Sequence, residues 1–208
     1  TWSMLAPSPE PHAEAVATVL GGRIHIVGGR RNTGQNNQGY GDHTDSDSHL
    51  LYDPVANAWE RAAPALSARN SATGAVIGGL WRVVGGRSVI GGPSEAHEVY
   101  DANEDRWRNA TPLPQGMGAG GNACGVIDGR LIAFGGEYFT GGGGGVHAEV
   151  WRYDDAKDAW EQLADMPTPR HGLGGVTIGE AIYAVGGAMR PSGNGTSSAV
   201  EILQPACA

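Results

Sequence analysis

Gly21-Gly22-Arg23-Ile24-His25-Ile26-Val27-Gly28-Gly29 is the stretch that decides the fold. A short turn leads into alternating and then apolar residues, and the segment ends on two glycines. Related segments follow at residues 78–86 (GGLWRVVGG), 128–136 (DGRLIAFGG) and 179–187 (GEAIYAVGG). The successive glycine pairs are 57, 50 and 51 residues apart. Self-similarity with a period near 50 residues predicts a repeat architecture with one continuous body.

Each repeat contains further short segments around this one. A small apolar segment precedes it, at residues 13–20, 71–77, 122–127 and 173–178. A third segment, which alternates apolar and polar residues, lies at residues 49–53, 98–101, 149–154 and 199–203. A fourth begins with tryptophan, at residues 59–61, 107–109 and 160–162. Short β-rich segments bounded by Gly, Pro, Asn and Asp are typical of strands joined by hairpins, so the chain is predicted to be all-β.

The order of these signals resembles the kelch repeat of β-propellers. A glycine pair is followed by Tyr-Asp, and a tryptophan stands seven residues after the tyrosine in three repeats. These pairs are Tyr52 and Trp59, Tyr100 and Trp107, and Tyr153 and Trp160. The resemblance, which is to a bacterial kelch-like protein, implies four-stranded antiparallel blades arranged radially around a channel.

We expect one propeller over residues 1–208. Its blades are predicted at about residues 11–66, 67–114, 115–167, and 168–208 together with 1–9. Residues 1–9, around Trp2, resemble a fourth strand without a blade, whereas the last repeat has a third strand and no tryptophan strand. This complementarity predicts a ring closed by the N-terminal strand in the last blade. The alternative is a set of repeats cut from a larger array, since kelch propellers usually have six or seven blades.

Composition excludes some classes of function. The net charge of −8 argues against nucleic-acid binding, which needs clustered Lys and Arg. No run of 18 apolar residues could span a membrane. Lys157 is the single lysine against thirteen arginines, which suggests a GC-rich bacterial genome. Because the chain begins with Thr1 rather than Met, we expect a processed or excised chain, exported to the periplasm or the medium.

The candidate binding site is the face that carries the longest loop, residues 30–48. Residues that open the first strands and residues that follow the glycine pairs should meet there, around one mouth. The candidate ligand-binding residues are Arg30, Arg69, Arg87, Glu137, Arg170 and His171. Guanidinium groups suit carboxylates, so an acidic sugar or a partner's carboxylate would be the ligand. Alternatively, Arg69 and Arg170 bond loop carbonyls and are structural.

The same loop holds the densest group of carboxylates, Asp42, Asp45 and Asp47. Their alternation could ligate a hard cation such as calcium. The loop lacks the central glycine and terminal glutamate of an EF-hand loop, and a solvated turn-rich loop is the favoured interpretation. No other cofactor is expected.

No nucleophile elbow, HExxH box or acid–base dyad is evident, so a non-enzymatic protein is favoured. The leading hypothesis is a protein-interaction module, or a subunit of an assembly, that binds through the long-loop face. The alternative is a carbohydrate-binding or mutarotase-like protein that recognises an acidic sugar. Bacterial sialic-acid mutarotases are kelch propellers with a Glu after the blade glycine and an Arg a few residues later. Glu137 fits the first part of that motif, but residues 138–146 contain no Arg.

Overall fold

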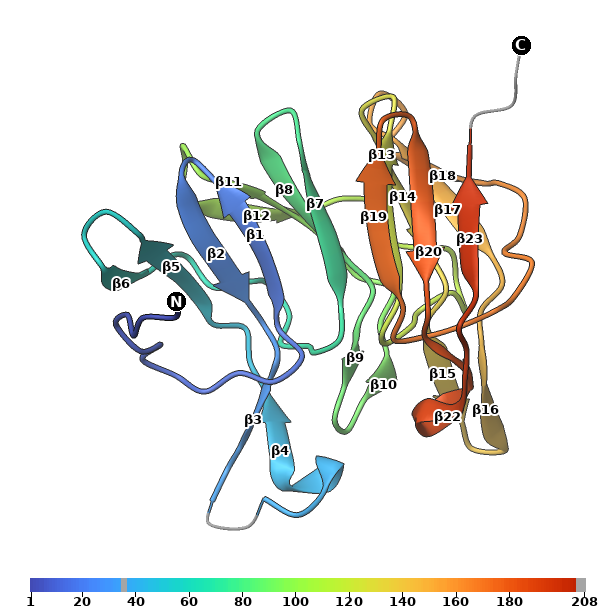
Figure 1. Cartoon of the computed structure of the whole chain (residues 1–208), viewed down its shortest axis with the longest axis horizontal. Helices are drawn as coiled ribbons and strands as arrows, with labels where there is room; N and C mark the ends of the chain where they lie inside the picture. Colours follow the sequence, from blue (N-terminus) through green and yellow to red (C-terminus); the bar gives the residue numbers. More distant parts are fainter. Residues whose placement is uncertain (35–36, 205–208) are drawn as a thin grey trace.

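The computed structural model describes residues 1–34 and 37–204, and it consists almost entirely of β-strands (Figure 1). Two single turns of 3-10 helix, η1 (Tyr40–Asp42) and η2 (Pro191–Gly193), are the helical segments of this part of the chain. Neither is long or apolar enough to be a membrane-spanning helix. Four antiparallel sheets follow one another along the sequence in a propeller arrangement. The predicted all-β class and the four blades are therefore confirmed.

Blades 1 and 2 are complete four-stranded sheets in which each strand pairs with its neighbour in sequence, apart from the inserted hairpins. Blade 1 contains β1 (Val16–Leu20), β2 (Arg23–Val27), β5 (His49–Asp53) and β6 (Ala58–Arg61). Blade 2 contains β7 (Thr73–Ile77), β8 (Leu80–Val84), β11 (His97–Asp101) and β12 (Arg106–Asn109).

Blade 3 has the same four strands, and blade 4 has three. Blade 3 contains β13 (Ala123–Ile127), β14 (Arg130–Phe134), β17 (Val150–Asp154) and β18 (Ala159–Gln162). Blade 4 contains β19 (Gly174–Ile178), β20 (Ala181–Val185) and β23 (Val200–Leu203). The inner strands β1, β7, β13 and β19 pack side by side in that order.

A two-stranded hairpin extends from each blade between its second and third long strands. The hairpins are β3 (Arg30–Asn32) with β4 (His43–Asp45), β9 (Arg87–Ser88) with β10 (Gly92–Pro93), β15 (Glu137–Thr140) with β16 (Gly143–Val146), and β21 (Ala188–Arg190) with β22 (Asn194–Thr196). All four extend from the same side of the molecule, at the bottom of Figure 1. We call this side the hairpin face.

The seven-residue spacing of tyrosine and tryptophan reflects strand register. Tyr52 lies directly opposite Trp59 in the β5–β6 hairpin, and the same pairing recurs in blades 2 and 3. The turn between the strands holds an Asn or Asp at positive φ, Asn57 in blade 1 (φ 49°). These are among the few side chains that tolerate this backbone conformation.

This turn residue forms a hydrogen-bonded clamp on the segment that arrives from the preceding blade. In blade 2, Asp105 Oδ1 accepts from the Tyr100 hydroxyl at 2.8 Å and from the Ala63 N–H at 2.9 Å. Trp107 Nε1 donates to the Ala63 carbonyl at 2.9 Å. Blades 1 and 3 repeat the clamp on Ala6 and Thr111. The repeated tyrosine and tryptophan therefore link blades as well as strands.

The glycine pairs form a second link between blades. We call one residue before the first strand of each blade its lead-in residue. The lead-in residues of blades 1 to 4 are His12, Arg69, Ala119 and Arg170. The second glycine of each of the first three pairs donates its N–H to the lead-in carbonyl of the next blade. The bonds are Gly29 to Arg69 (2.9 Å), Gly86 to Ala119 (2.8 Å) and Gly136 to Arg170 (2.9 Å). All these glycines have positive φ, a conformation that other residues rarely adopt.

The apolar core is divided among the three junctions between blades. Val27 packs with Trp81 between blades 1 and 2, and Val99 packs with Leu131 between blades 2 and 3. The third cluster, between blades 3 and 4, includes Phe134 and Ile182. Each blade therefore needs a neighbour to bury its faces, as expected for a repeat protein.

The predicted closure of the ring by the N-terminal strand was wrong. Residues 1–9 form no strand, and the Trp2 side chain is fully exposed. The clamp of blade 1 holds Ala6 against Asn57 and Trp59, so the N-terminal segment lies along blade 1. Figure 1 shows the N-terminal segment beside β5 and β6, on the opposite side of the molecule from β23. No contact comparable to those between neighbouring inner strands joins β19 to β1 in the described residues.

Replacing Gly86 with alanine tests the role of the glycine pair. Gly86 has φ +94°, and a Cβ atom there would lie 2.7 Å from the Asn70 carbonyl oxygen. We expect Gly86→Ala to lower the free energy of unfolding by roughly 2 kcal/mol, because it combines backbone strain with a clash. The matched control is Gly34→Ala, where nothing lies within 4 Å of the added atom. Equal urea midpoints for the two variants would contradict the assigned role.

Candidate functional site

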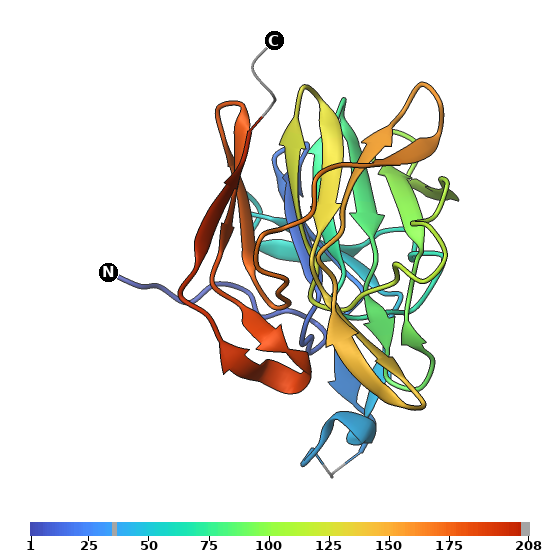
Figure 2. The same cartoon turned by 90° about the vertical axis from the view of Figure 1, so that its right-hand side faces the viewer.

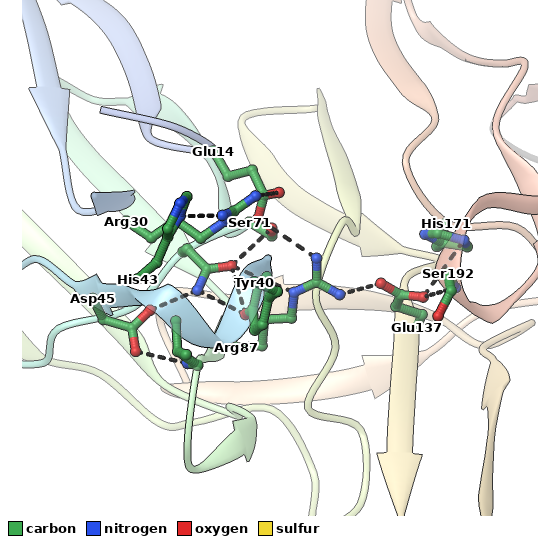
Figure 3. A network of polar contacts seen from close by, with 12 residues as sticks. Glu14, Arg30, Tyr40, His43, Asp45, Ser71, Arg87, Glu137, His171 and Ser192 are labelled. Atoms are coloured by element: carbon green, nitrogen blue, oxygen red, sulfur yellow. Dashed lines mark hydrogen bonds and ion pairs between the residues drawn. The ribbon is translucent and has the colours of Figure 1, made fainter. Parts of the chain in front are cut away.

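The side chains at the base of the hairpin face form one polar network across the blades (Figure 3). Arg30, at the start of β3, donates to Glu14 at 2.8 Å. Arg87, at the start of β9, lies 3.5 Å from the same carboxylate and forms a short ion pair with Glu137 of β15. We call this network, with His171, the mouth. It joins blades 1, 2 and 3 through alternating charges.

Glu137 is the most enclosed member of the mouth. It is 3% exposed, and besides Arg87 it accepts a hydrogen bond from the Ser192 N–H at 2.8 Å. His171 Nε2 lies 3.6 Å from the carboxylate and 3.0 Å from the Arg190 carbonyl oxygen. The Glu137 side chain of blade 3 therefore meets groups from blades 2 and 4. Its burial is compensated by these partners, as buried carboxylates require.

Glu14 is held in its ionised form. Burial on its own would raise the pKa of this carboxyl, but hydrogen bonds from Arg30 and Ser71 outweigh burial and lower the pKa to about 2. The positive charges of Arg30 and Arg87 contribute to this lowering of the pKa. Glu14 therefore carries a negative charge near neutral pH and partly neutralises both arginines. The mouth presents paired charges rather than a cluster of one sign.

The long loop folds back against the mouth. Tyr40, in η1, lies beneath both guanidinium groups, with its ring centroid 4.8 Å from Arg30 Cζ and 5.1 Å from Arg87 Cζ. Its hydroxyl is 3.0 Å from Asn70 Nδ2. Asp45, at the end of β4, accepts from Asn70 Nδ2 at 2.6 Å and from the Val89 N–H at 2.7 Å. These bonds tie the hairpin of blade 1 to blade 2 and fix the shape of the mouth.

Four of the six predicted ligand-binding residues meet here, and two do not. Arg30, Arg87, Glu137 and His171 lie in the mouth, as Figure 3 shows. Arg69 is buried and donates to the Glu98 carboxylate at 2.6 Å and to the Gly85 and Val83 carbonyls.

Arg170 has the same role in blade 4. It is fully buried and donates to Glu201 at 2.9 Å and to the Thr168 and Ala184 carbonyls. Both arginines therefore fit the alternative interpretation of the sequence, in which they bond carbonyls and are structural. Sequence reasoning missed their acidic partners, Glu98 and Glu201. These occupy equivalent positions in the third strands of the only two blades whose lead-in residue is arginine, and that coincidence was the available signal.

The three candidate calcium ligands do not converge. Asp42 accepts from the Gln38 and Gly39 N–H groups, and Asp45 is bound to blade 2. Within residues 1–34 and 37–204, Asp47 joins no group of three or more His, Cys, Asp or Glu side chains that could hold a metal.

Two adjoining cavities open beside the mouth. The first, of about 430 Å³, is lined by one residue from each blade among others: Glu14, Ser71, Asn122 and His171. The second, of about 560 Å³, lies between the hairpins and is lined by Tyr40, Ile90, Pro93 and Phe139. Arg87 and Glu137 line both cavities. An apolar groove therefore borders a charge-paired centre.

Sequence comparisons agree with this architecture. A family model described as the Kelch motif matches residues 119–167, and a second of the same description matches residues 11–64. The chain is similar to Kelch-like protein 25 of Xenopus tropicalis, with 26% identity over 88% of this chain and 30% of that protein. It is also similar to Kelch-like protein 35 of Mus musculus, with 29% identity over 71% of this chain and 24% of that protein.

A fungal relative is Kelch-like protein terF of Aspergillus terreus, with 25% identity over 85% of this chain and 39% of that protein. The chain thus spans well under half the length of these curated relatives.

The buried Arg69–Glu98 pair can be tested by stability. Arg69→Met leaves the Glu98 carboxylate buried without its cation, and we expect a loss of about 3–5 kcal/mol in the free energy of unfolding. Arg69→Met combined with Glu98→Met should recover most of that loss. Arg61, an exposed arginine paired with Glu10, provides the control: Glu10 keeps its ion pair with Arg31, so Arg61→Met should cost less than about 1 kcal/mol. A double variant as unstable as Arg69→Met would contradict the assignment.

Proposed function

Because this chain is a kelch-repeat protein, we propose that it acts as a non-enzymatic protein-interaction module or assembly subunit whose hairpin face is the binding surface. The blades provide a rigid base, and the hairpins and loops on that base differ in length and sequence. Loops on a rigid scaffold are where binding residues concentrate. The relatives named above carry kelch-like names, and we extend a protein-binding role from this family to the chain.

The observation that carries the proposal is the apolar groove beside the mouth. Ile90 is 98% exposed at the tip of the β9–β10 hairpin, and Phe139 is 43% exposed on β15. Both line the same cavity, together with Pro93. Single exposed apolar residues are common, but their grouping around one groove is typical of interaction sites. Arg87 and Glu137 at the base of the groove supply the polar groups that orient a partner.

The partner that fits this surface is a protein that inserts an apolar side chain between the hairpins and bonds the mouth with polar groups. The acidic-sugar alternative drew on Arg69 and Arg170, and both guanidinium groups are engaged within their blades. We therefore do not extend it. Export from the cell and a bacterial source remain predictions from the sequence.

Charge substitutions in the groove test the proposal. We expect immobilised wild-type chain to retain specific proteins from an extract, and Ile90→Asp combined with Phe139→Asp to reduce their recovery about tenfold or more, because a carboxylate cannot be buried unpaired in the contact. Val55→Asp, in an exposed turn of blade 1 away from the hairpin face, is the matched control. Mass spectrometry identifies the proteins retained. Recovery of the same proteins by the double variant would contradict the assigned surface.

A further inference from the structure

Two backbone hydrogen bonds recur at every junction between blades. The first runs from the second glycine of a pair to the lead-in carbonyl of the next blade, as described above. The second joins residues two positions after the lead-in residues. Ser71 N–H donates to the Glu14 carbonyl (2.9 Å), Gly121 to Ser71 (2.8 Å) and Gly172 to Gly121 (2.7 Å). Each blade therefore offers the next blade one N–H and one carbonyl.

At the two ends of the blade series these groups have no counterpart. Blade 4 presents the Gly187 N–H and the Gly172 carbonyl, and neither has a hydrogen-bond partner within residues 1–34 and 37–204. Blade 1 presents the His12 carbonyl and the Glu14 N–H, which are likewise unpaired in the described part of the chain. Blade 1 thus carries the two groups that complement those of blade 4.

The side chains of blade 4 show the same incompleteness. Its outer face carries Val176, Tyr183, Val185, Val200 and Ile202, which strand register places on one side of the sheet. Val200 is 62% exposed, whereas Val150, at the equivalent position of blade 3, is 4% exposed because blade 4 covers it. The outer face has the apolar composition of a junction and lacks its neighbour.

Blade 1 has the matching open face. Ile24 is 38% exposed, whereas Trp81, its equivalent in blade 2, is fully buried against blade 1. Val19, opposite Ile24, is 67% exposed. The open faces of blades 1 and 4 therefore correspond to the two sides of one ordinary junction.

The strand pairing of blade 4 is also incomplete. Among the described residues, β23 pairs with β20 alone, so its outer edge has no partner. Residues 1–5 form no strand, but the clamp fixes Ala6 on blade 1 as it fixes Ala63 on blade 2. In blade 2 the residues before this anchor, 58–62, contain the fourth strand of the preceding blade, β6. Residues 1–5 are therefore positioned to extend onto a blade that precedes blade 1.

We propose that a second copy of this chain covers the open face of blade 4, in a head-to-tail arrangement. Blade 1 of the second copy docks on the outer face of blade 4, and its residues 1–5 pair along the edge of β23. In the same way, blade 1 of the first copy docks on the outer face of blade 4 of the second copy, so that two chains close a ring of eight blades. Eight blades is within the range of known propellers. Closure depends on the rotation between copies, as for any head-to-tail interface.

A second copy is the favoured occupant because each chain carries both halves of the missing junction. Figure 2, turned by 90° from Figure 1, shows blade 4 standing at the outside of the blade series, and Figure 1 separates it from blade 1. Within residues 1–34 and 37–204 no strand of blade 4 forms a junction with a strand of blade 1. In the assembly, Gly187 N–H would donate to the His12 carbonyl of the second copy. Trp2 Nε1 of that copy would donate to the Ala164 carbonyl, the equivalent of Thr111 in the clamp.

The experiment measures the mass of the 208-residue chain by light scattering over a range of concentrations. We expect a particle of twice 21.5 kDa that dissociates on dilution. Val19→Asp on blade 1 and Val185→Asp on blade 4 should each weaken association by about 100-fold or more, since every junction then contains one unpaired carboxylate in an apolar contact. Val55→Asp, in an exposed turn, should leave the mass unchanged.

Mixing the two variants distinguishes a head-to-tail contact from other dimers. A Val19→Asp chain keeps an intact blade 4, and a Val185→Asp chain keeps an intact blade 1. Their mixture should therefore form a heterodimer with one wild-type junction, detected by a tag on one chain, although neither variant dimerises alone. Circular dichroism confirms that the variants fold. A monomeric wild-type chain at high micromolar concentration would overturn the proposal, and so would a mixture that stays monomeric.

Discussion

The hydrogen bond from a glycine pair to the next blade is the constraint on which the structure depends. The N–H of Gly29, Gly86 or Gly136 reaches a carbonyl of the following blade only because no side chain separates the two backbones. A Cβ atom on Gly28 would lie 2.7 Å from the Arg69 carbonyl oxygen, and one on Gly135 would lie 2.5 Å from that of Arg170. The positive φ of these residues turns the chain out of the blade at the same point. One backbone feature thus sets the spacing of the blades and directs the hairpins to one face.

The properties of the mouth follow from this geometry. Each glycine pair ends the second strand of its blade at the equivalent position. Arg30, Arg87 and Glu137, which begin the hairpins, therefore lie close to one another. Their charges pair across blades, and Tyr40 stacks on both arginines. Because its arginines are paired with carboxylates, the mouth attracts a free anion less strongly. The paired charges still form a rigid polar base beside the apolar groove. A surface of this kind suits a protein partner better than a small charged ligand.

Much of the fold could be predicted from the sequence because the kelch signals are local. The tyrosine-to-tryptophan spacing predicts which residues lie opposite in a hairpin, and the glycine pairs predict the number of blades. Four of the six predicted binding residues lie in the mouth because their positions follow from these local signals. The burial of Arg69 and Arg170 was missed, because their acidic partners stand 29 and 31 residues later in the chain and only their equivalent positions in two blades pointed to the pairing. The sequence also could not predict where residues 1–9 lie. A spacing specifies which strand fits a blade edge, but the same spacing serves pairing within a chain and between chains.

The most direct measurement is hydrogen exchange at the glycine amides, read by NMR at several protein concentrations. The amides of Gly29, Gly86 and Gly136 should be protected at every concentration, because their bonds lie within one chain. The Gly187 amide should exchange rapidly in dilute solution and become protected as the chain associates. A Gly187 amide that exchanges rapidly at every concentration, or a Gly86 amide that is unprotected in the folded chain, would contradict the account.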